Sequence, residues 1–390
     1  MKITYIIDSL AYKGGAERII SEKMNFLAEN AGYEVSVITC FQFPQENVNS
    51  YYLSGKVRQI DLCIPIFRQY SHHYPMRVYF KWKYGHELRS RLAETVNAVA
   101  PDIVVGVSYA LANVVCSMKC RAAKVIESHE ARPFTLSGVQ YRTSSAVSSV
   151  FNALYRQMYL RTVEKHADVV VTLTRKDKME WRRARRVVTI PNFSSMSVTR
   201  LSSCESKKVI AVGRCEWQKG YDRLIDVWKL VTAKHPDWQL HIYGDGALRG
   251  QMEDTIRREQ LGSVAIHPFT PDISSKYAES SICVLTSRFE GFSLVLLEAL
   301  RHGVPCVAYN CPFGPEDVVD DGKCGYIVED GDMEAFADRL CFLMENINVR
   351  KAFSAEAMEK AKTFDKETIM RQWTDLFEGL AKKTKEVKEP

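Results

Sequence analysis

The sequence predicts an α/β protein made of two doubly wound domains that face each other, each built on a parallel sheet. Two observations predict this fold class. Short runs of β-branched and other apolar residues alternate with helical segments, which is typical of strands buried on both faces. A polar, serine-rich segment at 191–206 separates two successive sets of these units. A length of 390 residues is ordinary for two domains.

The strands of each domain are expected in a regular series along the chain. The first domain is expected to contain strands at 2–8, 34–40, 102–108, 124–128, 168–174 and 187–190. The second is expected to contain strands at 207–214, 239–244, 264–269, 282–287, 305–310 and 325–329. Ligands of doubly wound sheets bind beyond the carboxyl ends of the strands, so the loops after the strands are expected to carry the chemistry.

The composition is that of a globular protein of a reducing compartment. No apolar stretch approaches the roughly 18 residues that a membrane-spanning helix needs. The first ten residues favour a buried strand over a signal peptide. The 11 cysteines include no CxxC pair, which indicates reduced thiols in the cytoplasm rather than a disulfide or zinc framework.

The charge of the chain is unevenly distributed. Residues 1–200 hold 28 Lys and Arg against 16 Asp and Glu, a net charge of +12, whereas the remainder carries −6. The densest basic cluster is 175–186, and two other basic segments contain interleaved aromatic residues, among them Trp82 and Tyr155. Basic residues mixed with amphipathic aromatics suit an anionic membrane surface, and solvated basic helix faces stay as an alternative. Nucleic-acid binding would also explain the basic half, but we expect no nucleic-acid partner, because it would leave the loops after the strands of the second domain without a purpose.

Three glycine-containing loops follow expected strands. Gly14 and Gly15 open a helix, where backbone could approach a phosphate or a sugar. In the loop 213–220, Arg214 and Lys219 could converge on a diphosphate, or could be two surface cations. The loop 244–250 resembles a dinucleotide fingerprint, but its GxGxxxG spacing and the missing acidic residue argue against a nicotinamide dehydrogenase.

The segment 287–303 holds two glutamates in different settings. Glu290 lies in a turn, and Glu298 lies in an apolar helix in which a carboxylate needs a partner. Ser293 is expected to cap this helix, whose N-terminal amides could bind a diphosphate. The residues that we expect to bind the donor here are Gly291, Phe292, Ser293, Leu294 and Glu298.

The order of these motifs resembles that of the retaining GT-B glycosyltransferases of family GT4. The matching elements are Gly14-Gly15-Ala-Glu, Ile190-Pro-Asn, Gly213-Arg214 with Lys219-Gly220, Gly244-Asp-Gly246, and the two-glutamate block that continues to Gly303-Val-Pro. The resemblance implies two Rossmann-like domains around a central cleft. An acceptor domain would span 1–195 with a returning helix at 367–385, and a donor domain would span 205–365.

The resemblance also implies roles for individual residues. Arg214 and Lys219 would bind the donor diphosphate, Glu298 the ribose, and Glu290 the sugar. Gly15 would lie against the diphosphate or the acceptor. His129 matches a histidine often found beside the reacting carbon, so His129 and Glu290 are the expected catalytic residues. Ser293 stands where many members have glycine, which leaves the identity of the sugar open.

The expected reaction needs neither a metal nor a cofactor. Fixed cations and helix amides would stabilise charge on the departing diphosphate. Asp332 is expected to be a helix N-cap rather than a metal ligand. Because the family retains anomeric configuration, the resemblance implies a front-face displacement without an obligatory enzyme nucleophile, with domain closure excluding water.

The segment around Cys311-Pro-Phe-Gly-Pro315 most resembles bacterial enzymes that extend glycans on polyprenyl diphosphate, such as N-acetylgalactosamine, galactose and glucose transferases. This implies a nucleotide-sugar donor such as a UDP-sugar, a lipid-linked or oligosaccharide acceptor, and a peripheral position at the inner face of the plasma membrane. Two other classes stay open, a nucleotide-sugar 2-epimerase and a non-catalytic nucleotide-sugar-binding protein.

Overall fold

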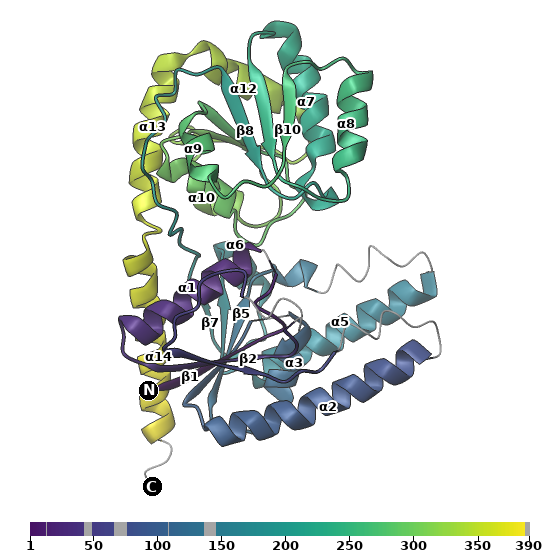
Figure 1. Cartoon of the computed structure of the whole chain (residues 1–390), viewed down its shortest axis with the longest axis vertical. Helices are drawn as coiled ribbons and strands as arrows, with labels where there is room; N and C mark the ends of the chain where they lie inside the picture. The colour runs from purple at the N-terminus through teal and green to yellow at the C-terminus, as the bar shows by residue number, and fades with distance from the viewer. Residues whose placement is uncertain (13, 43–48, 66–75, 108, 136–145, 387–390) are drawn as a thin grey trace. The chain divides into compact units, whose positions relative to one another are not determined.

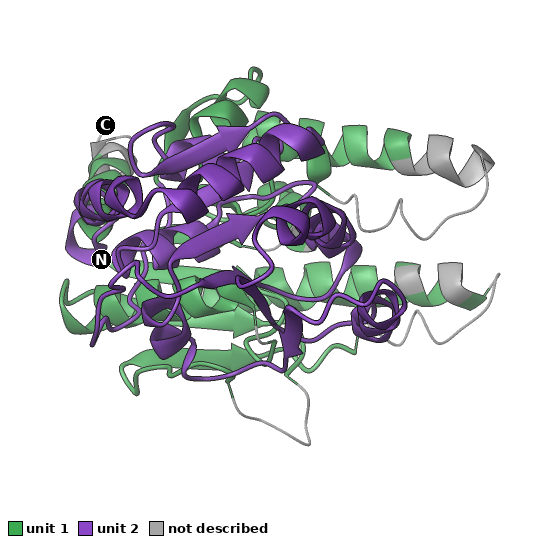
Figure 2. Ribbon diagram, turned by 90° about the horizontal axis from the view of Figure 1, so that it is seen from above, with its two compact units in different colours: residues 1–190, 369–390 green, residues 191–368 purple. Residues whose placement is uncertain are grey.

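The computed structural model describes residues 1–12, 14–42, 49–65, 76–107, 109–135 and 146–386 (Figure 1). The chain divides into two compact units, shown in different colours in Figure 2. Unit 1 comprises residues 1–190 and 369–390, and unit 2 comprises residues 191–368. Each unit contains one parallel sheet with helices beside it, so the predicted class of two doubly wound α/β domains is confirmed. The cleft between them stays a prediction.

The sheet of unit 1 has the strand order β3-β2-β1-β4-β5-β6-β7. All its pairings are parallel, and β1 pairs with both β2 and β4. Its strands are β1 (Lys2–Ile7), β2 (Glu34–Thr39), β3 (Val57–Asp61), β4 (Ile103–Gly106), β5 (Ala123–Ser128), β6 (Val169–Thr172) and β7 (Val187–Thr189). Its helices are α1 (Gly15–Glu29), α2 (Met76–Val99), α3 (Tyr109–Ser117), η2 (Arg132–Phe134), α5 (Ala146–His166) and α6 (Arg175–Glu180).

The sheet of unit 2 has the order β10-β9-β8-β11-β12-β13, also parallel throughout. Its strands are β8 (Lys208–Val212), β9 (Gln239–Tyr243), β10 (Val264–His267), β11 (Ile282–Leu285), β12 (Cys306–Tyr309) and β13 (Gly325–Val328). Its helices are η3 (Trp217–Lys219), α7 (Tyr221–Lys234), α8 (Arg249–Arg258), α9 (Ile273–Ala278), α10 (Leu294–Arg301), α11 (Pro315–Val318), α12 (Met333–Glu345) and α13 (Ile347–Lys362). The order reverses between β8 and β11, where such sheets bind ligands.

The C-terminal helix α14 (Lys366–Glu386) contributes to the core of unit 1. Trp373 and Phe377 on this helix are almost fully buried, and the Tyr33 hydroxyl donates a hydrogen bond of 3.0 Å to Glu378. The period of its buried residues is that of an amphipathic helix, so packing rather than propensity alone stabilises it. The helix therefore packs in the core of the N-terminal unit, although the segment that precedes it in sequence belongs to unit 2, residues 191–368.

The structure defines the basic cluster, shortens one predicted strand and adds a strand that was not predicted. The basic cluster at 175–186 is helical only over Arg175–Glu180, because Trp181 ends the helix and its ring is buried. The strand expected at 168–174 spans Val169–Thr172, and Thr174 caps the following helix through Asp177 N–H. β3 was not predicted. It pairs with a neighbour on one side only, so its residues lack a continuous apolar run.

In the described part of the chain, no helix combines the length and apolar character needed to cross a membrane.

Candidate functional site

The loops after β8 and β11 are tied together where the strand order of unit 2 reverses. The backbone N–H of Arg288 donates to the Gln218 carbonyl at 2.8 Å. The side-chain amide of Gln218 in turn donates to the Phe289 carbonyl at 3.1 Å. The Thr286 hydroxyl donates to the Gly220 carbonyl at 3.0 Å. These bonds hold the loop 213–220 against the loop 286–290, so their side chains keep a fixed relation.

Gly220 permits this close approach. It has a φ of +63°, which favours glycine, and an added Cβ would overlap the carbonyl oxygen of Thr286. Gly244 and Gly246 have a similar role, because a Cβ at either would overlap backbone of the loop after β8. The first two glycines of the motif GxGxxxG therefore allow two loops to pack backbone against backbone, which accounts for them without a dinucleotide.

Lys219 and Glu290 form an ion pair within these loops. Lys219 Nζ lies 2.8 Å from Glu290 Oε1, and their side chains are 15% and 8% exposed. The Ser287 hydroxyl donates to the same oxygen at 2.6 Å. The structure thus brings together two of the predicted site residues, and adds Ser287, which the sequence analysis did not single out. Arg214, in the same loop, is exposed, and its guanidinium has no partner within the described chain.

The N-terminus of α10 differs in part from the prediction. Ser293 occupies the N-cap position, but its hydroxyl makes no capping hydrogen bond, so the predicted cap is wrong. The Leu294 N–H donates to the Phe292 carbonyl at 2.9 Å, so it is already used. The amides of Phe292 and Ser293 donate no hydrogen bond within the described residues. Together with Gly291 before them, these two amides are the groups that an anion could take.

The Ser293 hydroxyl is buried and finds no hydrogen-bond partner among the described residues. A Cβ on Gly314 would lie 3.1 Å from this oxygen and 3.3 Å from Glu290 Cβ. The turn that contains Gly314 therefore lies against both Ser293 and Glu290. The Ser293 hydroxyl therefore lacks a hydrogen bond that a hydroxyl or phosphate oxygen of a bound ligand could supply.

Glu298 lies inside α10 and has the partner that a buried carboxylate needs. The Tyr277 hydroxyl, from α9, donates to Glu298 Oε2 at 3.2 Å. Burial, followed by the Glu298 charge, raises the pKa of Tyr277 well above its usual value, so the phenol remains a donor. His302 Nδ1 lies 2.7 Å from the Glu298 carbonyl, and its ring stacks on Tyr277. These contacts hold the second glutamate in place.

The predicted site residues of unit 1 lie at the starts and ends of its elements. Gly15 is the first residue of α1, which follows β1. Lys13, two residues before Gly15, lies outside the described residues. His129 directly follows β5, and its Nε2 lies 2.9 Å from Glu127 Oε2. The same carboxylate accepts a hydrogen bond from Lys23 of α1. His129 is thus connected to a buried ion pair.

Two further carboxyl groups near His129 have raised pKa values. Burial raises the pKa of Glu130 to about 7. Burial also raises the pKa of Asp177 to about 6, against hydrogen bonds from the Arg132 amide and the Ser128 hydroxyl that lower it. Both groups therefore change protonation between about pH 6 and pH 7.

The sequence contained a signal for the missed residues Lys23 and Glu127. In α1 the apolar residues recur at Ile19, Ile20, Met24 and Leu27, and Lys23 falls on this buried face. Glu127 lies in a strand buried on both faces. A lysine and a glutamate, each in an apolar pattern, can be buried only as a pair.

The acidic residues considered for metal binding have structural roles. Asp332 caps α12 by accepting from the Ala335 N–H at 2.9 Å, so that prediction is confirmed. Among the residues described, no group of three or more His, Cys, Asp or Glu side chains is placed to hold a metal ion.

Comparison with known proteins agrees with this architecture. Two family models match, described as Glycosyltransferase Family 4 over residues 13–195 and Glycosyl transferases group 1 over residues 200–360. An uncharacterized glycosyltransferase of Haemophilus influenzae is 27% identical over 384 residues, 96% of this chain and 99% of the relative. The amylovoran biosynthesis glycosyltransferase AmsD of Erwinia amylovora is 32% identical over 222 residues, 54% of this chain and 62% of the relative.

Solved structures share the fold at low identity. Sucrose-phosphate synthase from Thermosynechococcus elongatus has a TM-score of 0.78 at 18% identity, with 97% of this chain and 98% of that chain covered. TarM of S. aureus, in complex with UDP and alpha-GlcNAc-glycerol, has a TM-score of 0.75 at 15% identity, with 96% and 98% covered.

The fold is therefore that of the GT-B glycosyltransferases. Because the two family models together match residues 13–195 and 200–360, one in each half, the chain belongs to the glycosyltransferases of the GT4 type.

Proposed function

We propose that the protein is a retaining, metal-independent glycosyltransferase that moves a hexose or an N-acetylhexosamine from a UDP-sugar to a polyprenyl-diphosphate-linked glycan. Its products would enter a bacterial surface polysaccharide, such as a capsule or an O-antigen, or a glycoprotein glycan. The observation that carries this proposal is the Lys219–Glu290 pair, held by Ser287 at the carboxyl ends of β8 and β11. The amylovoran enzyme AmsD and the UDP complex of TarM support the substrate classes.

The donor diphosphate would bind between the cations and the N-terminus of α10. Arg214 is exposed, and the Lys219 ammonium has donors left beyond its hydrogen bond to Glu290, so both can contact phosphate oxygens. The amides of Phe292 and Ser293 would bind one more oxygen. Glu298 would accept hydrogen bonds from the ribose hydroxyls, with Tyr277 holding one of its oxygens in place. Glu290 would accept from a sugar hydroxyl.

The reaction would follow from where charge develops. The bond between sugar C1 and the diphosphate oxygen breaks, and the acceptor oxygen forms its bond to C1 on the same face. The acceptor proton goes to the departing phosphate oxygen. Arg214, Lys219 and the α10 amides would stabilise the negative charge on the diphosphate at that moment. His129 would lie beside C1 and fix the position of the reacting groups.

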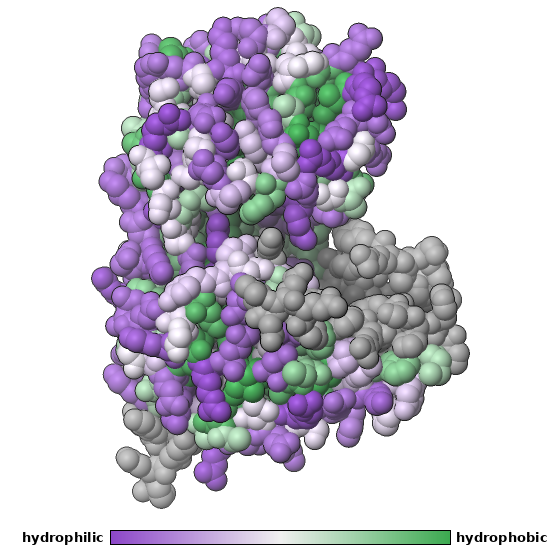
Figure 3. Space-filling view, in the orientation of Figure 1, coloured by the Kyte–Doolittle hydropathy of each residue, from purple (hydrophilic) through white to green (hydrophobic). Residues whose placement is uncertain are grey.

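Unit 1 would bind the acceptor and the membrane that carries it. Its excess positive charge suits anionic lipid headgroups. Large apolar side chains are exposed on its helices, among them Trp82 of α2 and Leu154 and Met158 of α5. Figure 3 shows hydrophilic residues over most of the visible face, with hydrophobic side chains in small separate areas. We infer a peripheral position at the inner face of the plasma membrane, which the basic charge and these exposed apolar side chains support.

A thermal-shift screen against nucleotide sugars and nucleoside diphosphates, with and without a chelator, tests the donor site. A ligand that binds the native state raises the melting temperature. We expect UDP and UDP-sugars to raise it equally with and without chelator, and expect a smaller shift with UDP in Lys219→Met at the same UDP concentration. Glu279→Gln, in an exposed pair with Lys276, is the matched control and should respond like the wild type.

The screen, followed by analysis of the products formed from the bound UDP-sugar, separates the alternatives. If none of the nucleotides raises the melting temperature, the proposed roles of Arg214, Lys219 and Glu298 are contradicted. Conversion of the bound UDP-sugar to its 2-epimer without an acceptor would show an epimerase. Binding without transfer to any acceptor would favour a non-catalytic nucleotide-sugar-binding protein.

A further inference from the structure

A chain of buried polar side chains lies behind His129. We propose that Glu127 is the positioning residue of His129, fixing one tautomer and one ring orientation, and that Lys23 and one buried water complete its hydrogen bonds. The proposal rests on the proposed function, in which His129 lies beside the reacting carbon. Its residues all belong to unit 1, so it does not depend on the donor-binding residues of unit 2.

Lys23 and Glu127 form a buried ion pair, and His129 is hydrogen-bonded to it. The side chains of Lys23 and Glu127 are each 1% exposed, and that of His129 is 6% exposed. Glu127 Oε2 accepts from Lys23 and lies 2.9 Å from His129 Nε2. The Lys23 ammonium also lies 4.4 Å from the centre of the Trp373 ring. A charge so deeply buried is retained only when both partners are held in place.

The protonation of Glu127 decides which nitrogen of His129 is the donor. Burial raises the pKa of Glu127, but the Lys23 charge and the hydrogen bond from His129 together bring it below the usual value. The carboxylate is therefore ionised and can only accept. His129 Nε2 must then carry a proton, and the neutral ring has its lone pair on Nδ1. Glu127 thus presents Nδ1 as an acceptor to a bound substrate.

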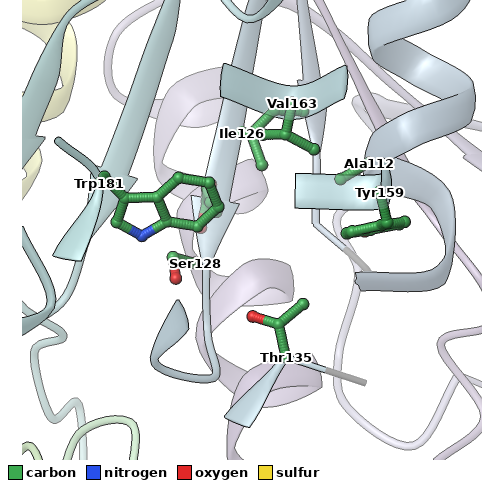
Figure 4. Close-up of a pocket in the computed structure, with 8 residues that line it drawn as sticks. Ala112, Ile126, Ser128, Thr135, Tyr159, Val163 and Trp181 are labelled. Atoms are coloured by element: carbon green, nitrogen blue, oxygen red, sulfur yellow. The ribbon is translucent and has the colours of Figure 1, made fainter. Parts of the chain in front are cut away.

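Glu127 is among the residues that line a small cavity. Figure 4 shows Thr135, Tyr159 and Trp181 around this cavity, whose volume is about 10 Å³. Glu127 Oε1, the Thr135 hydroxyl and the Tyr159 hydroxyl are buried and have no hydrogen-bond partner among the described residues. A buried water needs roughly this volume and about three polar partners. One water would satisfy all three atoms at once.

The other titratable groups that face Glu127 are neutral. Tyr5 of β1 is buried, and burial followed by the Glu127 charge raises the Tyr5 pKa well above its usual value. Burial likewise raises the pKa of Tyr159 of α5. Glu127 therefore acts through Lys23, which balances its charge, and through His129.

Imidazole ¹⁵N NMR on histidine-labelled protein tests this directly, with His129→Gln to assign the signals. In the wild type we expect His129 to hold the Nε2–H tautomer. In Glu127→Gln, whose amide can donate as well as accept, the two tautomers should mix. Glu164→Gln is the control, because Glu164 is a buried carboxylate of the same unit that pairs with Arg132 at 2.8 Å. It should leave the His129 signals unchanged.

Kinetics and stability separate positioning from a structural role. We expect Glu127→Gln to lower kcat by about 10²-fold, the cost of a misplaced group, with the KM for the donor nearly unchanged. Lys23→Met/Glu127→Gln removes both charges, so it should regain stability without regaining kcat. A wild-type tautomer in Glu127→Gln, or a kcat restored in the double variant, would overturn the proposal.

The remaining outcomes are also distinguishable. A wild-type enzyme without transfer activity would refute the proposed function, whereas the NMR result would still report on the Glu127–His129 contact. A high-resolution crystal structure should show one water within hydrogen-bonding distance of Glu127 and Thr135. A dry cavity there would overturn the part of the proposal that concerns the water.

Discussion

Replacing Lys219 by methionine should affect both folding and donor binding, for separable reasons. Lys219 Nζ lies 2.8 Å from Glu290 Oε1, and the two side chains are 15% and 8% exposed. Removing one partner of a buried pair costs about 3–5 kcal/mol, and the partial exposure of Lys219 favours the low end, about 3 kcal/mol. The hydrogen bond from Ser287 keeps Glu290 partly satisfied, which reduces the cost further.

The effect of Lys219→Met on UDP binding comes from a lost charge-assisted hydrogen bond. Such a bond contributes about 1.5–3 kcal/mol, which corresponds to a Kd for UDP weakened about 10- to 150-fold. Glu290→Gln should act in the opposite direction. Its neutral amide holds the Lys219 ammonium less tightly, so the ammonium becomes available to the diphosphate. UDP should therefore bind Glu290→Gln at least as tightly as the wild type, while sugar transfer falls.

Isothermal titration calorimetry with UDP and urea denaturation measure the two effects. Lys219→Met/Glu290→Gln, which leaves no unpaired charge, shows whether weakened binding is a consequence of misfolding. Wild-type affinity for UDP in Lys219→Met would refute the reasoning. So would an equal loss of affinity in Lys219→Met and Glu290→Gln, since both would then act on folding alone.

Three further predictions concern backbone, pH and membrane. Gly220→Ala should lower the free energy of unfolding by more than about 1–2 kcal/mol in urea denaturation, because φ is +63° and a Cβ would overlap the Thr286 carbonyl; wild-type stability would contradict this. The folded pKa values of Asp177 and Glu130, about 6 and about 7, lie above unfolded values near 4, so the folded state binds more protons between these limits. Stability from these two groups is therefore greatest below about pH 4 and declines as pH rises to about 7, and Asp177→Asn should flatten this slope in denaturation at several pH values. Trp82→Ser should weaken co-sedimentation with anionic vesicles, since this exposed indole would otherwise bury apolar area in the headgroup region; unchanged, salt-insensitive binding would contradict a role for it.

The sequence was most informative where local pattern and fold agree. The strands of both sheets were predicted because buried parallel strands read as continuous apolar runs, whereas β3 lies at an edge and has no such run. Lys219 and Glu290 were each selected by their loops. Their contact could not be predicted, because it depends on how the loops after β8 and β11 approach each other around Gly220.

Other features of the site depend on three-dimensional packing. Ser293 has the residue type and position of an N-cap, but its hydroxyl points to no amide of the helix and lies near Gly314 instead. The partner of Glu298 was expected, yet Tyr277 comes from a different helix. The apolar patterns around Lys23 and Glu127 indicate that each needs a partner, but the two residues are 104 positions apart, so the fold is needed to show that they are partners.

The central claim is that this chain transfers a sugar from a UDP-sugar donor. The most direct test incubates the purified protein and chelator with a UDP-hexose or UDP-N-acetylhexosamine and a short synthetic polyprenyl-diphosphate glycan, and follows the acceptor by mass spectrometry. We expect an acceptor heavier by one sugar, an α linkage by NMR when the donor is α, and a strong loss of product with Glu290→Gln but not with Glu279→Gln. An acceptor left unchanged with each UDP-sugar, or full activity in Glu290→Gln, would contradict this claim.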